Sequence, residues 1–334
     1  MNTWKPLNFS QTLDWLLEKD NPSVRLFTLM DILNQDVEKE SLNGIRQEIM
    51  ESQPVSQILA NQKENGNWQK EKQFYTAKYR GTVWTLIILA ELGADGRDPR
   101  IQKGCEFVLN VSQESRSGGF SIRSDKSGSG IPSGVIPCLT GNMVWSLIKF
   151  GYLNDPRLQQ SINWITTYQR FDDGEGAAPK GWPYDGWQIC WGSHTCHMGV
   201  VKSLKALSAI PCEKRSPEVC KTLENGAEFM LIHHVHKRSH NLTRVSKPGW
   251  KKLGFPRMYQ TDVLEIVDIL TKLGHRDPRM QEAVDLIAAK QLPNGRWLLE
   301  DTFNGKFQTN IEQHRKESKW ITLKALGALK RFYA

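Results

Sequence analysis

The sequence predicts an all-helical protein in which six pairs of helices close into a double ring, an (α/α)6 toroid. Three observations indicate this fold class. A short helix–turn–helix phrase recurs along the chain, the segments around it carry apolar residues at helical spacing, and a Gln-x-x-x-Gly-x-Trp motif occurs in two of the longer connections. We expect residues 1–334 to form one domain, with N-terminal helices within 10–60 as part of the ring.

The recurring phrase is a glycine followed, a few residues later, by Asp-Pro-Arg. Glycine tolerates the left-handed backbone that ends a helix. Aspartate accepts hydrogen bonds from the free amides of the next helix, and proline fits its first position. Each copy therefore predicts a tight turn between antiparallel helices. The copies begin their second helices at positions 98, 155 and 277, with a weaker Ser-Pro copy at 216, so the spacing is about 57 to 61 residues.

The helices on the two sides of each turn differ in their apolar pattern. Those after the turn are amphipathic, which suits an outer ring. Those before it are apolar on more sides, which suits an inner ring packed on both faces. The expected inner segments are 23–33, 82–90, 142–150, 200–209, 262–273 and 322–329.

The connections carry a second repeated motif. Gln62 to Trp68 and Gln291 to Trp297 both read Gln-x-x-x-Gly-x-Trp, and looser versions begin at Gln113 and Gln169. This pattern resembles the glutamine–tryptophan repeats of squalene and oxidosqualene cyclases, which protein prenyltransferase β subunits carry in degenerate form. The resemblance implies a toroid whose central cavity binds isoprenoid chains, with each glutamine bonded to the next turn and the aromatic ring stacked beneath it.

Composition limits the partners. A formal net charge of +8 favours anionic partners, but the basic residues form no helical stripe with interleaved aromatics, so nucleic acid is not expected. No apolar run reaches the roughly eighteen residues of a membrane span, and the N-terminus lacks the apolar core of a signal peptide, so we expect a cytoplasmic protein. Peripheral membrane contact and a protein partner stay open.

The resemblance implies that the inner helices begin at one shared rim, where polar residues would form a site. It also implies that a basic group with a tyrosine holds a prenyl diphosphate there. The candidate substrate-binding residues on this basis are Lys78, Tyr79, Arg80, Trp145, Arg257, Tyr259, Lys319 and Trp320.

The cyclases and the transferases of these families carry different catalytic motifs in their sequences. The Asp-x-Asp-Asp acid of class II cyclases is absent, and the acidic cluster at 171–175 favours a solvated turn. The segment 190–199 is similar to the Asp-x-Cys zinc segment of prenyltransferases, with His194 in the aspartate place and Cys196 in the cysteine place. The third zinc ligand of that family, a histidine, would fall near Lys319, where none occurs; His314 is nearby but off position.

A different zinc site is therefore the prediction, with Cys138, Cys190, His194 and Cys196 as ligands and His197 as a further nitrogen donor. The alternative is that these are reduced core cysteines and surface histidines. A nucleophilic Cys–His pair is a third reading. Asp262 would act as an acid, a base or an extra ligand, beside Cys196 and His194 as catalytic residues.

A second histidine group, at 233–240, ends an outer helix and leads into a basic loop. It predicts either a solvated loop or a basic lip that holds a diphosphate. Taken together, the sequence predicts an isoprenoid-handling enzyme of prenyltransferase or terpene-cyclase type, more by transfer from a prenyl diphosphate than by proton-initiated cyclisation. The alternative is a non-catalytic toroid that binds a ligand or a partner protein.

Overall fold

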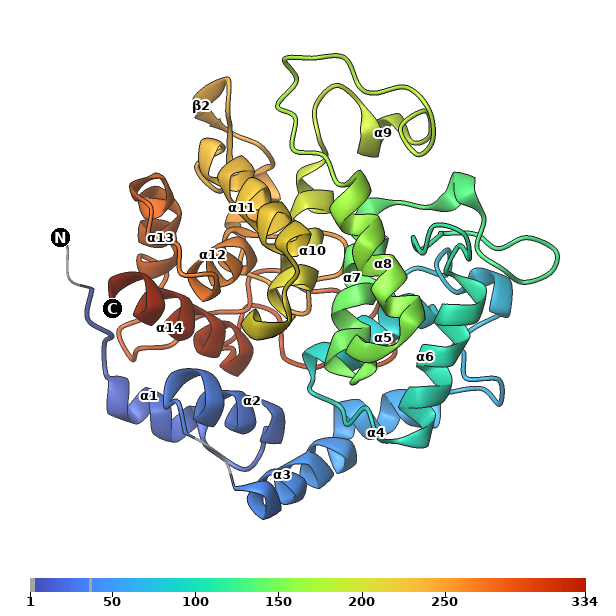
Figure 1. Cartoon of the computed structure of the whole chain (residues 1–334). Helices are drawn as coiled ribbons and strands as arrows, with labels where there is room; N and C mark the ends of the chain where they lie inside the picture. The colour runs from blue at the N-terminus through green and yellow to red at the C-terminus, as the bar shows by residue number, and fades with distance from the viewer. Residues whose placement is uncertain (1–3, 36–37) are drawn as a thin grey trace.

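The structure, a computed structural model, describes residues 4–35 and 38–334. Its helices form two concentric rings (Figure 1), as the sequence predicts. The inner ring consists of α2 (Pro22–Phe27), continued by a π-helical turn (Thr28–Ile32), α5 (Thr82–Glu91), α7 (Pro137–Lys149), α10 (His197–Ser208), α12 (Val263–Lys272) and α14 (Lys319–Tyr333).

The outer ring covers these helices. It consists of α3 (Lys39–Glu51), α4 (Gln53–Ala60), α6 (Pro99–Val111), α8 (Pro156–Tyr168), α11 (Pro217–Ile232) and α13 (Gln281–Ala288), while α1 (Phe9–Leu16) packs beside α14. The short helix α9 (Gln188–Trp191) lies in the connection between α8 and α10. A small antiparallel hairpin, β1 (Lys237–Arg238) and β2 (Asn241–Val245), follows α11.

The inner ring is closed. Each inner helix from α5 to α14 packs on the next, and α14 packs on α2 and its π-helical turn. The hydroxyl of Ser23 at the start of α2 donates to the carbonyl of Leu92 at the end of α5, at 2.6 Å, which completes the circle. Both ends of the chain consequently meet in one continuous core.

Burial follows the two rings. Every residue of α5 is buried, because outer helices cover one side and the centre of the ring covers the other. In α6, which follows the first turn, the buried residues share one face and include Ile101, Cys105 and Val108. The other face of α6 meets water, as a period of 3.6 residues requires.

The Asp-Pro-Arg turns have the predicted geometry. The carboxylates of Asp98, Asp155 and Asp277 each accept the backbone N–H of the arginine two residues later, at 2.8 Å. The arginine side chain folds back onto the same carboxylate. Gly93 and Gly151, before two of these turns, have φ of 72° and 91°, the left-handed region that glycine tolerates. The turns thus combine a C-cap, an N-cap and an ion pair.

The glutamines link one repeat to the next. Gln62 Nε2 donates to the carbonyl of Arg100 at 2.8 Å, and Gln113 Nε2 donates to the carbonyl of Arg157 at 2.8 Å. Each acceptor is the arginine of the following Asp-Pro-Arg turn. Gln169, in the looser copy, donates to the carbonyl of the next residue instead. The links at Gln62 and Gln113 therefore hold the end of one outer helix against the start of the next.

The motif tryptophans connect the two rings. The indole N–H groups of Trp68 and Trp297 donate to carbonyls near the ends of α4 and α13, both at 2.8 Å. Their backbone N–H groups donate to the hydroxyls of Thr82 and Thr322 in the first turns of inner helices. A threonine at the start of an inner helix is thus part of the repeat.

No helix in the described part of the chain is both long enough and apolar enough to cross a membrane.

We predict that Gln113→Ala lowers the free energy of unfolding by about 2 kcal/mol, because the buried amide contacts the Arg157 carbonyl and the Ser161 hydroxyl and both would lose a donor. Urea denaturation of the purified variant measures this. Gln102→Ala, which truncates an exposed glutamine on the neighbouring outer helix, is the matched control. Equal midpoints for the two variants would show that the glutamine links do not stabilise the ring.

Candidate metal centre

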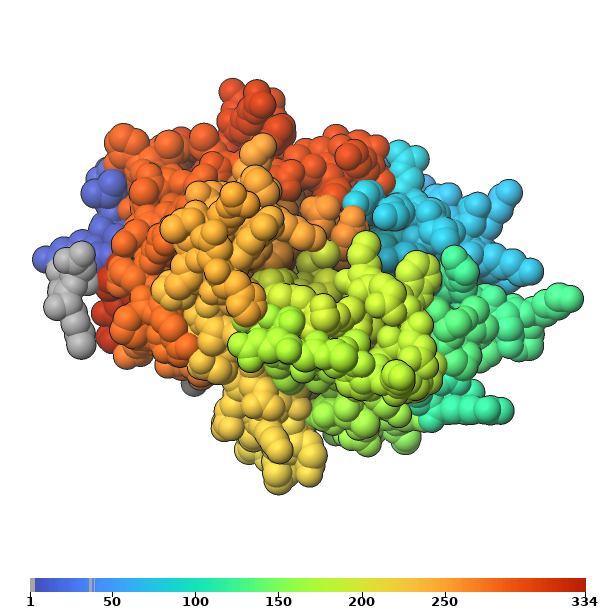
Figure 2. All heavy atoms as spheres, turned by 90° about the horizontal axis from the view of Figure 1, so that it is seen from above, coloured from blue at the N-terminus to red at the C-terminus, as the bar shows by residue number. Residues whose placement is uncertain are grey.

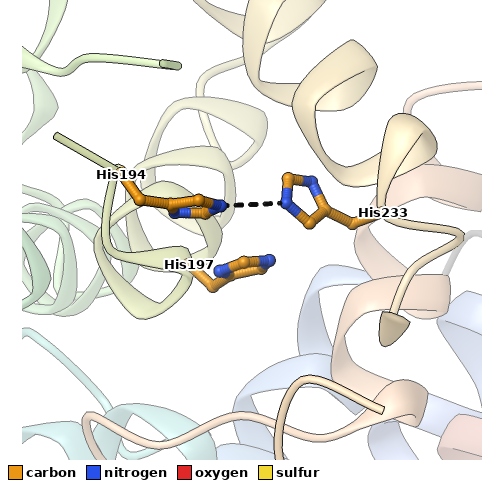
Figure 3. A group of neighbouring side chains, drawn as sticks. All are labelled: His194, His197 and His233. Carbon is orange, nitrogen blue, oxygen red and sulfur yellow. Dashed lines mark hydrogen bonds between the residues drawn. The ribbon is translucent and has the colours of Figure 1, made fainter. Parts of the chain in front are cut away.

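Three histidines from two neighbouring repeats converge at the rim where inner helices begin (Figure 3). His194 lies in the connection before α10, His197 is the first residue of α10, and His233 follows the last residue of α11. One ring nitrogen of each lies within 4.8 Å of those of the other two. All three lie in the part of the chain that the structure describes, and two of the rings are partly exposed at the rim.

Backbone carbonyls fix the orientation of two of these imidazole rings. His194 Nδ1 lies 2.8 Å from the Thr195 carbonyl, and His233 Nδ1 lies 2.6 Å from the Phe229 carbonyl. A carbonyl can only accept, so Nδ1 carries the hydrogen in both rings. In a neutral ring Nε2 then has a free lone pair. These two Nε2 atoms face each other at 3.3 Å.

A carboxylate lies against two of these three histidines. Asp173 Oδ1 lies 2.9 Å from His194 Nε2 and 3.1 Å from His233 Nε2. The Ser239 hydroxyl donates to the same oxygen at 2.6 Å, and His240 Nε2 donates to the Asp173 carbonyl at 2.6 Å. Separations of 2.9 to 3.3 Å match the edge of a tetrahedron whose centre lies about 2.0 Å from each donor, the bond length of zinc.

His197 lies against the other two histidines. Its ring stacks on that of His194, with centroids 5.3 Å apart and an interplanar angle of 11°, and meets His233 edge-on at 4.2 Å. Its Nε2 is buried and has no hydrogen-bond partner among the residues that the structure describes. Burial, then the charges of His233, His194 and Lys247, lower the pKa of His197 to about 2, and burial also lowers the pKa of His233. Both rings are therefore neutral near pH 7, the form that binds metals.

The sequence prediction did not contain this centre. Asp173 lies in the acidic cluster predicted to be a solvated turn, and His233 lies in the group predicted to be a solvated loop or a basic lip. The solvated-loop interpretation is wrong for His233 and His236, which are both 0% exposed. One feature of the sequence could have indicated this centre: both segments lie in connections that lead to the same rim.

The predicted cysteine ligands lie nearby but form no such group. Cys138 begins α7 after Pro137, Cys190 lies on α9, and Cys196 precedes α10. Burial, then the neighbouring Cys196 and Cys190, raise the pKa of Cys138, so the three thiols share one part of the rim. Of the four predicted ligands, only His194 belongs to the compact donor group found in the described residues, together with His197, the further predicted donor.

Asp262 and Arg257 are engaged with each other. Asp262 Oδ1 caps α12 by accepting the N–H of Glu265, and Oδ2 accepts from Arg257 Nη2 at 2.6 Å and from the Gly254 N–H at 2.9 Å. Arg257 also pairs with Asp301 at 2.8 Å. Both Asp262 and Arg257 are at most 5% exposed, so here they hold the loop before α12.

An aromatic cluster lies farther along the same rim and consists of Tyr75, Tyr79, Trp84, Tyr259 and Phe303. The Lys78 ammonium lies 5.3 Å from the Tyr259 ring, and Arg80 donates to the Gly305 carbonyl. Burial, then Cys138, raise the pKa of Tyr75, which puts this tyrosine beside the thiols. The rim therefore runs from the histidines through the thiols to the aromatic cluster.

The other predicted substrate residues lie elsewhere. Lys319 pairs with Glu18 at 2.8 Å and with Asp20. Trp145 and Trp320 line a central cavity of about 280 Å³ that all six inner helices surround. The predicted substrate-binding set is thus divided among the rim, the α12 loop and the centre of the ring.

The central cavity is bordered by ion pairs rather than by hydrocarbon alone. Lys202, which is fully buried, pairs with Glu265 at 2.7 Å, and Lys205 pairs with Glu265 at 3.2 Å and with Glu91. Lys324 reaches the other oxygen of Glu91 at 3.0 Å. A prenyl chain in this cavity would lie against these charges.

No protein-family model matches the sequence, and no curated protein matches it. Among solved structures the chain is similar to type II terpene cyclase MstE from Scytonema in complex with geranylgeranyl dihydroxybenzoate, with 13% identity, a TM-score of 0.43, and 99% of this chain and 92% of that chain covered. It is also similar to a glycosyl hydrolase family 88 protein from Bacteroides vulgatus, with 13% identity, a TM-score of 0.47, and 98% and 92% covered. Likenesses of this size say nothing about the reaction of this chain.

We predict that the central ion pairs make stability depend on pH. Burial alone would raise the pKa of Glu265, but Lys202 and Lys205 lower it to about 2 from 4.5. Because the folded pKa is depressed, this stabilisation is present above about pH 4.5 and is lost as the pH falls toward 2.

The test is Glu265→Gln. It should lose roughly 3 kcal/mol of stability near pH 7 and show a shallower decline below pH 4.5 in denaturant unfolding. Glu64→Gln, at an exposed glutamate, should keep the decline of the unmodified protein. The same slope in both variants would argue against a charged Glu265 in the folded state.

Proposed function

We propose that this protein is a metal-dependent enzyme with a helical-toroid fold, and that His194, His197, His233 and Asp173 hold the metal. The observation that carries the proposal is the meeting of His194 Nε2, His233 Nε2 and Asp173 Oδ1 at 2.9 to 3.3 Å from one another. Imidazole lone pairs and a carboxylate oxygen this close together repel one another unless a proton or a metal cation lies between them. Nitrogen and oxygen donors with these separations suit tetrahedral zinc.

The surroundings of the donors support the same proposal. Each of the two best-oriented rings has its second nitrogen bonded to a backbone carbonyl, which fixes the tautomer and the ring plane. Ser239 donates to the same oxygen of Asp173, and His240 donates to the Asp173 backbone carbonyl, so both hold this residue in place. A zinc ion bound here would supply a Lewis acid that polarises a substrate oxygen or activates a water.

The proposed substrate is an isoprenoid or a similar apolar chain with an anionic group. Residues 236–261 include seven Lys or Arg and no Asp or Glu, and one of these, Lys247, lies close enough to His197 to lower its pKa. In this proposal Lys247 attracts the anionic group toward the metal. The apolar part lies over the aromatic cluster, and the half-buried Cys196 contacts the substrate between the two.

We predict one zinc per chain in protein purified without chelators, measured by inductively coupled plasma mass spectrometry. His233→Ala and Asp173→Ala should each lower the zinc content at least tenfold, because each removes a proposed ligand. His314→Ala, at an exposed histidine, should bind zinc normally. Cys196→Ser should also bind normally, and the cobalt-substituted protein should lack a sulfur-to-metal charge-transfer band.

These measurements distinguish a zinc site made of histidines and Asp173 from one made of cysteines. Zinc that survives His233→Ala but is lost in Cys196→Ser would favour the cysteine set that the sequence predicts. A metal-free protein that takes up no zinc, cobalt or manganese on dialysis would remove the proposal. Circular dichroism of each variant shows whether it folds.

We also predict that geranylgeranyl diphosphate raises the melting temperature of the zinc-loaded protein more than geranylgeraniol or inorganic diphosphate alone does. Lys247→Ala should weaken the effect of the diphosphate-bearing ligand about tenfold, and Tyr259→Ala should weaken the effects of both isoprenoids. Stabilisation by none of the three would favour the alternative of a non-catalytic toroid that binds a partner protein.

A further inference from the structure

Three large apolar side chains project into water around α9. Ile189 is 85% exposed, Trp182 is 39% exposed and Trp187 is 37% exposed. The indole N–H groups of the two tryptophans donate to the carbonyls of Pro132 and Ser133, at 3.0 and 2.9 Å. Both indole N–H groups thus bond to the protein. The parts of these side chains that are exposed to water are apolar: carbon atoms of the tryptophan rings and the isoleucine. Contiguous exposed apolar side chains of this size mark a contact surface.

The β1–β2 hairpin beside this segment carries one more exposed apolar side chain together with exposed basic side chains. Leu242 is 40% exposed on β2, in a stretch, 236–261, that holds no acidic residue and seven Lys or Arg, of which Lys237 and Arg257 are buried in ion pairs with Glu282 and Asp262. Arg238 and Arg244 flank it and are exposed. In the part of the chain that the structure describes, neither arginine forms an ion pair.

The two segments lie on one face. Both are at the top of Figure 1, and the space-filling view from above shows them side by side (Figure 2). Asp173 lies in the same connection as α9. It accepts a hydrogen bond from the Ser239 hydroxyl and contacts His240, both in the hairpin, and so links the α9 segment to the hairpin. The α9 segment and the hairpin therefore make one apolar and basic surface next to the candidate metal centre.

We propose that this surface docks on an anionic lipid bilayer. Tryptophan, isoleucine and leucine enter the boundary between headgroups and acyl chains, and unpaired arginines beside them contact lipid phosphates. The net charge of +8 attracts the whole molecule to such a surface. Docking is separate from the proposed catalysis, although it would bring an apolar-chain substrate to the rim.

Other occupants fit less well. A nucleic acid would gain from the arginines but not from the exposed apolar side chains of Ile189 and Leu242. A second copy of the chain docked through the same face would bring two basic hairpins together. A bilayer accommodates both the apolar and the basic residues.

Vesicle flotation of the full chain tests the proposal, with phosphatidylcholine vesicles that contain or lack phosphatidylglycerol. We expect the protein to float with the anionic vesicles, and the double variant Ile189→Ser, Leu242→Ser to lower the bound fraction about tenfold. Arg238→Ser with Arg244→Ser should also weaken binding, and should flatten its dependence on salt. Met30→Ser, at a 48% exposed methionine in the inner-ring segment before Ile32, is the matched control and should float normally.

The proposal is overturned if the unmodified protein does not float with anionic vesicles, or if both double variants float as well as it does. It is also overturned if the protein does not bind vesicles but binds single-stranded RNA, or self-associates through Ile189 and Leu242. Zinc content, measured on the same samples, distinguishes this failure from a failure of the metal proposal, because none of the four substituted positions of the double variants is a proposed ligand.

Discussion

The bond from a motif glutamine to the carbonyl of the next Asp-Pro-Arg turn ties one helix pair to the next at two places in the ring. Gln62 and Gln113 make it directly, at 2.8 Å in both cases. At these two places the bond joins the end of one outer helix to the start of the next, while Gln169 and Gln291 donate within their own connections. Where the bond is made, it helps to hold successive inner helices so that they begin at a common rim.

The centre of the ring also contains buried charges, which cost free energy to remove from water. Glu91 and Glu265, from two inner helices, share three lysines, and burying such charges is favourable only when every one is paired. A purely apolar centre would have been easier to stabilise. The charges contact specific partners on two other inner helices, α10 and α14, so they favour one arrangement of the ring over the slipped packings that apolar side chains would tolerate.

The candidate metal centre occupies a seam between repeats. His194 and His197 come from the start of one inner helix, His233 from the end of the outer helix that follows it, and Asp173 from the connection before both. Backbone carbonyls orient two of the rings from behind, which leaves their lone pairs directed into the seam. The neighbouring α9 segment and hairpin surround this seam with apolar and basic side chains.

The double ring could be predicted from the amino-acid order alone, because capping, helical periodicity and the Gln–Trp motif are local and act on near neighbours. Asp155, Pro156 and Arg157 specify their turn whatever surrounds them. The rim position of His194 and the thiols followed from the resemblance to the prenyltransferase zinc segment rather than from local geometry.

Which donors meet depends on tertiary packing. Asp173 and His233 are sixty residues apart, and their pairing depends on how two connections fold over the same edge. Asp262 and Arg257, whose charges were predicted to serve a catalytic step and a substrate, are five residues apart, and the loop before α12 brings them together. In the folded chain they pair with each other, because a buried carboxylate is stable only with its own cation beside it.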